Sequence, residues 1–354
     1  MKKLMRLFLA LAVAGLYLQS PAAAGAADKK EFAVAWSHYT GWEPWAYAEH
    51  SGILEKWAKK YGIKISITLV NDYVESINLY TSGKFDACTM TNMDALTIPA
   101  VGGVDSTALI VGDFSNGNDG IVVRKGESVK ALKGRTVKLV QFSVSHYLLS
   151  RALAMNKMKE KDIKLVNTSD ADIGAVFLSD PEGIAVTWNP ILMQVRNGKG
   201  VKMVFDSAKI PGEIIDMMVV KTDASDAFKK ALTGAWYETM AAMSARGKEN
   251  PALTHMAKVA GGTLAEFKAQ LKTTKMFYTA AEAAKFTLGK DLKNTMEYVR
   301  TFSFDQGLYG EGAASKDLVG IQFPDQSIMG DKDNVKLRFD ASYMQLAADG
   351  KLKK

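Results

Sequence analysis

The stretch from Phe32 to Gly62, FAVAWSHYTGWEPWAYAEHSGILEKWAKKYG, constrains the fold most because its hydrophobic pattern changes once along its length. Phe32, Val34 and Trp36 alternate with small residues, which is typical of a buried strand. Pro44 can open a helix because a proline lacks the N–H that would be unpaired there, and apolar residues then recur at helical spacing up to Gly62. The stretch therefore predicts a strand, a loop and a helix, the unit from which α/β proteins are built.

The same alternation of strands and helices continues along the chain. Further strands are predicted over residues 63–70, 85–90, 106–113, 136–140 and 183–188. A helix is predicted over Tyr73–Thr81 with Asp72 as its N-cap, because an aspartate side chain can accept a hydrogen bond from the first helical turn. The chain after Asp226 is predicted to be mainly helical, and the last forty or so residues are expected to form loops and one helical turn. This order predicts an α/β fold with two units, each a mostly parallel sheet flanked by helices.

The two units are expected to be joined twice. The segment FSNGNDG leads out of the first unit, and the apolar segment IIDMMVVKTDA leads back to it. We therefore expect residues 28–117 and 214–354 to form one lobe and residues 118–213 to form the other. Two connecting strands make a hinge, and a hinge lets two lobes close around a ligand.

Residues 1–27 have the composition of a secretory signal peptide. Lys2, Lys3 and Arg6 precede a short apolar run, and the small residues PAAAGAA follow it, so cleavage is expected near Ala24–Ala27. The apolar run is too short for a stable membrane anchor. No cysteine lies near the cleavage site, so we do not expect a lipoprotein. The mature chain is predicted to be a periplasmic protein.

Charge and cysteine content exclude some classes of partner and some kinds of structure. Removal of the signal peptide takes away three positive charges and no negative ones, which lowers the formal charge from +7 to +4. No basic block with interleaved aromatic residues is present, so nucleic acid is not expected as a partner. Cys88 is the only cysteine, and we expect it to be a small buried apolar residue rather than part of a disulfide.

The common signatures of catalysis and cofactor binding are missing. The sequence has no phosphate-binding P-loop, no dinucleotide-binding glycine pattern and no nucleophile elbow. No two of the four histidines are spaced i, i+4, as a zinc-protease helix requires. His38 and His146 could meet across a cleft, but the sequence predicts no metal site there. We expect no cofactor and no enzymatic activity.

Polar and aromatic residues gather at the carboxyl ends of the predicted strands, where open α/β sheets bind ligands. Each residue alone could be a turn or cap former, and Trp42 or Trp45 could simply fill the core. Taken together, they predict two rows of side chains that face each other across a cleft. The candidate ligand-binding residues are His38, Tyr39, Trp42, Glu43, Asn92, Asp94, Asp119, Ser143, Ser145, His146, Asp172, Trp188 and Asn189.

Five short motifs occur in order over nearly the whole mature chain. They are Gly41-Trp42-Glu43-Pro44-Trp45, Ser51-Gly52-Ile53-Leu54-Glu55, Ser82-Gly83-Lys84-Phe85-Asp86, Leu132-Lys133-Gly134-Arg135-Thr136-Val137 and Ala185-Val186-Thr187-Trp188-Asn189-Pro190. With these motifs the chain resembles the periplasmic substrate-binding proteins of ABC importers, in the branch that binds nitrate, sulfonates, taurine and thiamine precursors. Within this branch it looks most similar to the binding proteins encoded beside urea carboxylase. The resemblance implies the type II fold with two α/β lobes, a small molecule clamped between them, and docking on an ABC permease at the inner membrane. We expect the protein to be a monomer.

The composition of the predicted cleft loops bears on the ligand. These loops contain no lysine or arginine but several acidic residues, whereas a sulfonate or nitrate site would use cationic side chains or many free N–H groups. A guanidinium could stack on Trp42 or Trp188 and donate to a carboxylate. Urea also suits asparagine and aspartate side chains. We therefore predict a receptor for urea or a guanidine-like compound.

Three alternatives to this function remain open from the sequence. Backbone amides at helix N-termini could still bind an anion, so a sulfonate, taurine or pyrimidine-type ligand is one alternative. A sensory receptor that does not feed a permease is the second. An enzyme related to the thiamine-precursor branch is the third. It would need a cofactor-anchoring lysine or a metal-binding histidine cluster in the cleft, but the cleft loops lack lysine and the chain has an export signal.

Overall fold

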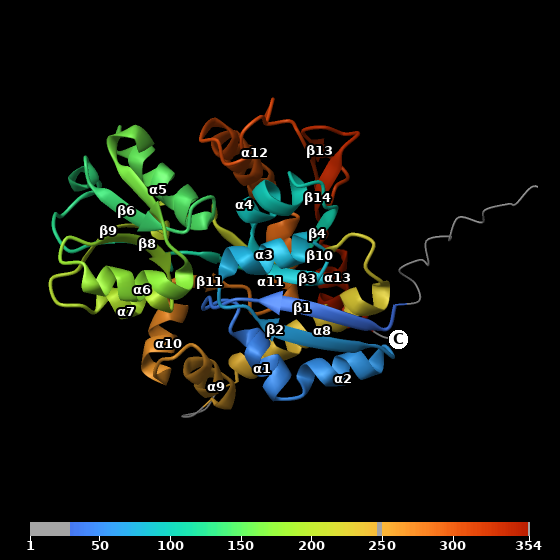
Figure 1. The fold of residues 1–354 in the computed structure, drawn as a ribbon. Coiled ribbons are helices and arrows are strands. Elements are labelled where there is room, and N and C mark those ends of the chain that lie inside the picture. The colour runs from blue at the N-terminus through green and yellow to red at the C-terminus, as the bar shows by residue number, and fades with distance from the viewer. Residues whose placement is uncertain (1–28, 246–249, 353–354) are drawn as a thin grey trace, which may run out of the picture.

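The structure is a computed structural model that describes residues 29–245 and 250–352, so the predicted signal peptide lies outside the described residues. It contains two sheets with flanking helices, which confirms the predicted α/β class (Figure 1). The larger sheet consists of β1 (Glu31–Trp36), β2 (Lys64–Leu69), β3 (Ala87–Thr91), β4 (Ser106–Ser115), β10 (Ile215–Lys221), β11 (Thr274–Met276), β12 (Gly320–Gln322), β13 (Ile328–Met329) and β14 (Val335–Phe339). The smaller sheet consists of β5 (Asp119–Val123), β6 (Thr136–Leu139), β7 (Lys164–Asn167), β8 (Ile184–Trp188) and β9 (Lys202–Asp206).

Both sheets mix parallel and antiparallel pairs. The larger sheet has the order β13-β12-β14-β4-β10-β3-β1-β2, with β11 paired to β4, and the smaller has the order β7-β6-β8-β5-β9. The predicted βαβ units give parallel pairs, such as β1 with β2 and β6 with β7. The antiparallel pairs include those of β10 with β3 and β4 and of β5 with β8 and β9. Strands β5 and β10 follow the two passages between the sheets, so they run against their neighbours and make the sheets less parallel than expected.

Helices surround both sheets. Those that pack on the smaller sheet are α5 (Val144–Met155), α6 (Asp170–Ser179) and α7 (Ile191–Arg196). The other α-helices belong to the chain segments of the larger sheet: α1 (Pro44–His50), α2 (Ile53–Lys60), α3 (Tyr73–Thr81), α4 (Asn92–Ala95), α8 (Asp226–Met243), α9 (Pro251–Val259), α10 (Leu264–Leu271), α11 (Ala280–Thr287), α12 (Lys290–Asp305) and α13 (Ser342–Ala348). Short 3₁₀ or π turns are η2 (Leu96–Ala100), η3 (Val129–Leu132), η4 (Glu160–Asp162) and η5 (Ser207–Lys209).

Two helix predictions have different outcomes. The Asp72 N-cap is confirmed, because its carboxylate accepts a hydrogen bond of 2.9 Å from the backbone N–H of Glu75. The single helix expected from Pro44 onward is wrong, because the structure divides it into α1 and α2. Gly52 lies between them with a φ of 75°, a left-handed conformation that glycine adopts without steric cost and that ends a regular helix.

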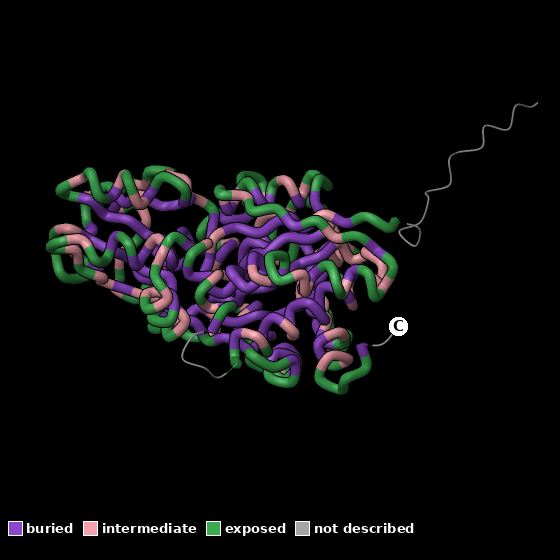
Figure 2. Tube along the Cα trace, turned by 90° about the horizontal axis from the view of Figure 1, so that it is seen from below, coloured by how far each residue is buried: buried purple, intermediate pink, exposed green. Residues whose placement is uncertain are grey.

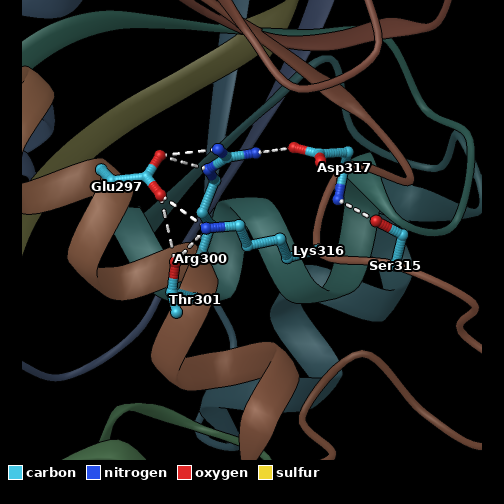
Figure 3. A network of polar contacts seen from close by, with 6 residues as sticks. All are labelled: Glu297, Arg300, Thr301, Ser315, Lys316 and Asp317. Atoms are coloured by element: carbon cyan, nitrogen blue, oxygen red, sulfur yellow. Dashed lines mark hydrogen bonds and ion pairs between the residues drawn. The ribbon is translucent and has the colours of Figure 1, made fainter.

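The C-terminal segment is more ordered than its sequence indicates. The expected loops contain β12, β13 and β14, and β14 pairs in parallel with the distant β4. An ionic network also holds the preceding loop to α12 (Figure 3). Arg300 on α12 is 7% exposed and binds Glu297 and Asp317, while Lys316 donates to Glu297 at 2.7 Å. These strands depend on long-range pairing, which a local hydrophobic pattern does not show.

Buried residues concentrate along the strands, and exposed residues lie mainly on the outer turns and helices (Figure 2). Cys88 on β3 is fully buried, as predicted. Within residues 29–245 and 250–352, no helix has the length and apolar character needed to span a bilayer.

The chain crosses from the larger sheet to the smaller one after β4 and returns after β9. We keep residues 117 and 213 as proposed lobe boundaries. We refer to the larger sheet with its helices as the first lobe and to the smaller sheet with its helices as the second lobe.

Candidate ligand-binding site

A small buried cavity lies where the two lobes meet. It is tightly closed, because the centre of a water-sized sphere can move within only about 10 Å³ of it. The first lobe supplies Tyr39, Trp42, Tyr73, Thr91 and Asp216 to its lining, and the second lobe supplies Asp119, Val144 and Trp188. Each of these eight residues is at most 4% exposed. The structure therefore shows the lobes closed over the cavity.

Four aromatic side chains around this cavity contact one another in sequence. The ring centroids of Tyr39 and Trp42 are 5.0 Å apart, those of Trp42 and Tyr73 are 5.5 Å apart, and those of Tyr73 and Trp188 are 5.4 Å apart. Tyr39 and Trp42 come from the loop before α1, Tyr73 begins α3, and Trp188 ends β8. Aromatic faces attract cations through their quadrupoles, so this lining suits a positively charged guest.

Two carboxylates line the cavity and a third lies beside it. Ser115 donates to Asp119 at 2.5 Å, and the Tyr39 hydroxyl donates to Asp113 at 2.9 Å. Burial raises the pKa of Asp119 and of Asp113 to about 7, and burial together with the neighbouring carboxyl of Asp113 raises the pKa of Asp216 well above its usual value. Among the described residues, one oxygen of Asp113 and one of Asp216 accept no hydrogen bond from an N–H or hydroxyl donor, and the two carboxyl groups interact with each other instead. The indole N–H of Trp42 donates to no described residue. Buried polar atoms without partners indicate a place for a polar ligand.

Direct hydrogen bonds also join the two lobes around the cavity. The Trp188 indole donates to the carbonyl oxygen of His38 at 2.9 Å. The backbone N–H of Val144 donates to Asp94 at 3.2 Å, and that of Tyr73 donates to Asp170 at 3.0 Å. Closure of the lobes therefore rests on protein groups as well as on any guest between them.

Asp170 provides a test of this closure. Replacing Asp170 by alanine removes the acceptor for Tyr73 N–H, a contribution of about 1 kcal/mol, so the ratio of closed to open molecules should fall several-fold. Small-angle scattering of the ligand-free protein should show a larger radius of gyration for D170A. D172A is the matched control, because Asp172 is exposed on the same helix and accepts only from Ser169 within its own lobe. Equal radii for D170A and D172A would contradict the role of Asp170.

The structure brings four of the predicted site residues to the cavity: Tyr39, Trp42, Asp119 and Trp188. Three others lie beside it. Asp94 accepts from the Tyr73 hydroxyl at 2.6 Å, and burial raises its pKa to about 6. His38 and Glu43 form a pair at 2.8 Å, in which burial raises the pKa of Glu43 and the hydrogen bond from His38 opposes that rise.

The remaining predicted residues do not line the cavity, because most of them bind groups of their own surroundings. Asn92 bonds Glu213 and Ile215 next to the return passage. Ser143 caps α5, His146 bonds Glu160 at 2.8 Å, Asn189 donates to Thr273 at 3.3 Å, and Asp172 is exposed. Ser145 is buried with a hydroxyl that has no partner in the described part of the chain. Several of these polar residues form caps or turns. This is the structural role that we gave in the sequence analysis as the alternative to ligand binding.

Sequence reasoning missed five residues at or beside the cavity: Tyr73, Thr91, Asp113, Val144 and Asp216. Asp216 offered a usable signal, because it is the only charged residue within the apolar run IIDMMVV. A buried strand excludes an acid unless something compensates for the loss of water. Among the described residues, no group of three or more histidine, cysteine, aspartate or glutamate side chains is placed to hold a metal ion.

A larger groove elsewhere on the first lobe does not bring the predicted residues together. It is an open groove between α8 and β14 with a volume of about 530 Å³. Its cationic side chains already have partners, since Lys229 donates to the carbonyl oxygen of Thr222 and Arg338 binds Asp105. We therefore regard the small cavity between the lobes, with its unpaired carboxylate oxygens, as the candidate site.

Two lobes closed over a cavity, with two connections between them, define the class of proteins that have the periplasmic binding protein fold. Residues 30–235 match the family described as NMT1/THI5 like, and the chain belongs to this family. No curated protein sequence matches the chain significantly.

Solved structures with the same fold cover most of the chain. The alkanesulfonate-binding protein SsuA from Xanthomonas axonopodis pv. citri, bound to MOPS, aligns with a TM-score of 0.65 and 15% identity over 80% of this chain and 96% of its own. The aliphatic sulphonate binding protein SsuA from Escherichia coli aligns with a TM-score of 0.59 and 20% identity over 76% and 94%. The CA3427 gene product of Candida albicans aligns with a TM-score of 0.61 and 14% identity over 81% and 92%. These structural alignments show a similar fold. The low sequence identities do not identify the ligand of this chain, which we infer from its own residues.

Proposed function

We propose that this chain is an exported solute-binding protein that delivers urea or a guanidine-like compound to an ABC permease. The observation that carries the proposal is the lining of the interlobe cavity. It contains Asp119, Asp216 and four aromatic rings, and none of its eight lining residues is a lysine or an arginine. We also infer that the protein works as a monomer after removal of its signal peptide, and that it belongs with the binding proteins encoded beside urea carboxylase.

A cationic or strongly donating guest relieves the cost of burying these acids. A carboxylate that leaves water without a partner loses several kcal/mol of solvation, on the order of the penalties measured for buried charges. A guanidinium is planar and offers N–H donors that match carboxylate oxygens, and it can stack on Trp42 or Trp188. Urea offers the same flat shape and N–H donors without the charge. The cavity as it stands has room for about one water molecule, so a guest of a few atoms enters only if the lining side chains or the lobes move apart slightly.

An alkylsulfonate is the second candidate, and the likeness in fold to the sulfonate-binding proteins supports it. Such an anion would face Asp119 and Asp216 and would need free N–H groups to offset that repulsion. The backbone N–H of Val144, at the start of α5, already donates to Asp94. A sensory receptor that signals the same ligand would use the same site, and capture of the membrane partner would distinguish it from a transport protein.

Isothermal titration calorimetry of the mature chain tests the ligand. The panel consists of guanidinium, methylguanidinium, urea, taurine, ethanesulfonate and nitrate, with thermal shift as a second readout because a ligand of the folded state raises its stability. We expect heat of binding and stabilisation from guanidinium, methylguanidinium or urea and none from the anions. Saturable binding of ethanesulfonate, with no response to the nitrogen compounds, would reject the proposed ligand.

A further inference from the structure

Asp113 and Asp216 form an unusual acidic pair at the hinge between the lobes. They are direct partners in the antiparallel register of β4 and β10, so their side chains extend from the same face of the sheet. Asp113 lies two residues before β4 ends, and Asp216 is the second residue of β10. Both are nearly inaccessible, with exposures of 1% and 2%.

The groups that face this pair are neutral or acidic. The Tyr39 hydroxyl donates to Asp113, and the charge of Asp119 raises the pKa of both carboxyl groups. Asp113 in turn raises the pKa of the nearby Tyr278. The neighbouring strands place Thr91 of β3 opposite Asp216 and Met276 of β11 opposite Asp113. Trp236 of α8 packs against Gly112 beside them. No lysine, arginine or histidine is among the described groups that shift the pKa of either carboxyl.

The loop above the pair leaves no room for water to solvate it freely. A Cβ atom added to Gly41 would lie 2.2 Å from an oxygen of Asp113, so the backbone of this loop covers the carboxyl closely. Two adjacent carboxyl groups in such a place cannot both be ionised, because each raises the cost of charging the other. The empty site must therefore retain a proton near neutral pH.

We propose that Asp113 and Asp216 share one proton in the ligand-free protein and that a singly charged cation replaces this proton, which leaves to the solvent. This inference rests on the proposed function and deepens it, because it makes the pair the determinant that selects a monocation over a neutral or anionic solute. Exchange of one positive charge for another keeps the charge of the buried site constant. Asp216 lines the cavity, so the pair can contact a ligand bound there.

The proposed exchange predicts how the affinity for guanidinium changes with pH. Guanidinium keeps its charge over the accessible pH range, so any proton released on binding comes from the protein. Above the pKa of Asp119, which is about 7, the pair is the main source of that proton. Because the ligand and the proton compete, the association constant for guanidinium should rise about tenfold per pH unit while the pair still holds the proton. Urea carries no charge, so any binding of urea should release no proton.

Calorimetry in two buffers counts the protons. The mature protein is titrated with guanidinium chloride at about pH 7.5 in phosphate and in Tris at equal ionic strength, because these buffers take up protons with very different heats. The difference in apparent enthalpy should correspond to about one proton released per guanidinium. In D216N the amide cannot ionise, so the release and the pH dependence of affinity should fall toward zero. D172N, on the exposed face of α6, should behave like the unaltered protein.

The outcomes separate this inference from the proposed function. Guanidinium binding with equal enthalpies in both buffers would overturn the proton exchange and leave the ligand assignment standing. Failure of guanidinium to bind, together with binding of ethanesulfonate, would overturn both. If D216N does not show a cooperative thermal transition, D113N removes the same pair from the other strand and is expected to lose the proton release in the same way.

Discussion

Replacing Trp188 by alanine is expected to weaken guanidinium binding at least about a hundredfold. Trp188 lines the cavity, and its indole N–H joins the lobes by donating to His38. A cation–π contact contributes about 2 kcal/mol in a desolvated site and a hydrogen bond about 1 kcal/mol, so their joint loss is about 3 kcal/mol. Titration calorimetry of W188A against the unaltered protein gives the ratio of dissociation constants.

Phenylalanine at position 188 is the matched control. W188F keeps an aromatic face but cannot donate to His38, so its affinity should fall only about tenfold, between the unaltered protein and W188A. Trp188 is 3% exposed, and its truncation removes core packing, so thermal melting of each variant must first show a cooperative transition. Unchanged affinity in a folded W188A would show that the guest does not bind between the lobes.

Replacing Asp119 by asparagine is expected to change how stability depends on pH. Burial raises the pKa of Asp119 to about 7, with a further contribution from Asp94, against an opposing hydrogen bond from Ser115. The folded state therefore binds more protons than the unfolded state between about pH 4 and pH 7. The unaltered protein loses stability as pH rises through this window, by up to about 4 kcal/mol from this group.

D119N lacks this loss because an amide does not ionise. The difference in unfolding free energy between D119N and the unaltered protein should shift in favour of the variant by up to about 4 kcal/mol from about pH 4 to about pH 8. Thermal unfolding is the suitable measurement, because urea and guanidinium are candidate ligands. D172N is again the control, since Asp172 is exposed. A difference that stays constant with pH, or one that moves the other way, would contradict a protonated Asp119 in the empty site.

The parts of the site that could be predicted follow from local patterns. Trp42 lies in the loop after a predicted strand, and Trp188 is the last residue of another. Both positions are at carboxyl ends of strands, where α/β sheets bind ligands. The Asp113–Asp216 pair could not be predicted, because it depends on the register between two strands that lie far apart in the sequence. The same reason explains β12 and β14, whose pairing is long-range and whose local signal is weak. Asn92 and His146 are predicted site residues that do not line the cavity, because their side chains bond Glu213, Ile215 and Glu160 instead.

We propose above all that the two lobes enclose a small nitrogen-rich guest between aromatic rings and aspartates. A crystal structure of the mature protein grown with guanidinium chloride tests it most directly. We predict a planar guest between Trp42 and Trp188, within hydrogen-bonding distance of Asp119 or Asp216. A closed structure with guanidinium missing from that cavity, and with a sulfonate bound there when one is supplied instead, would contradict the account.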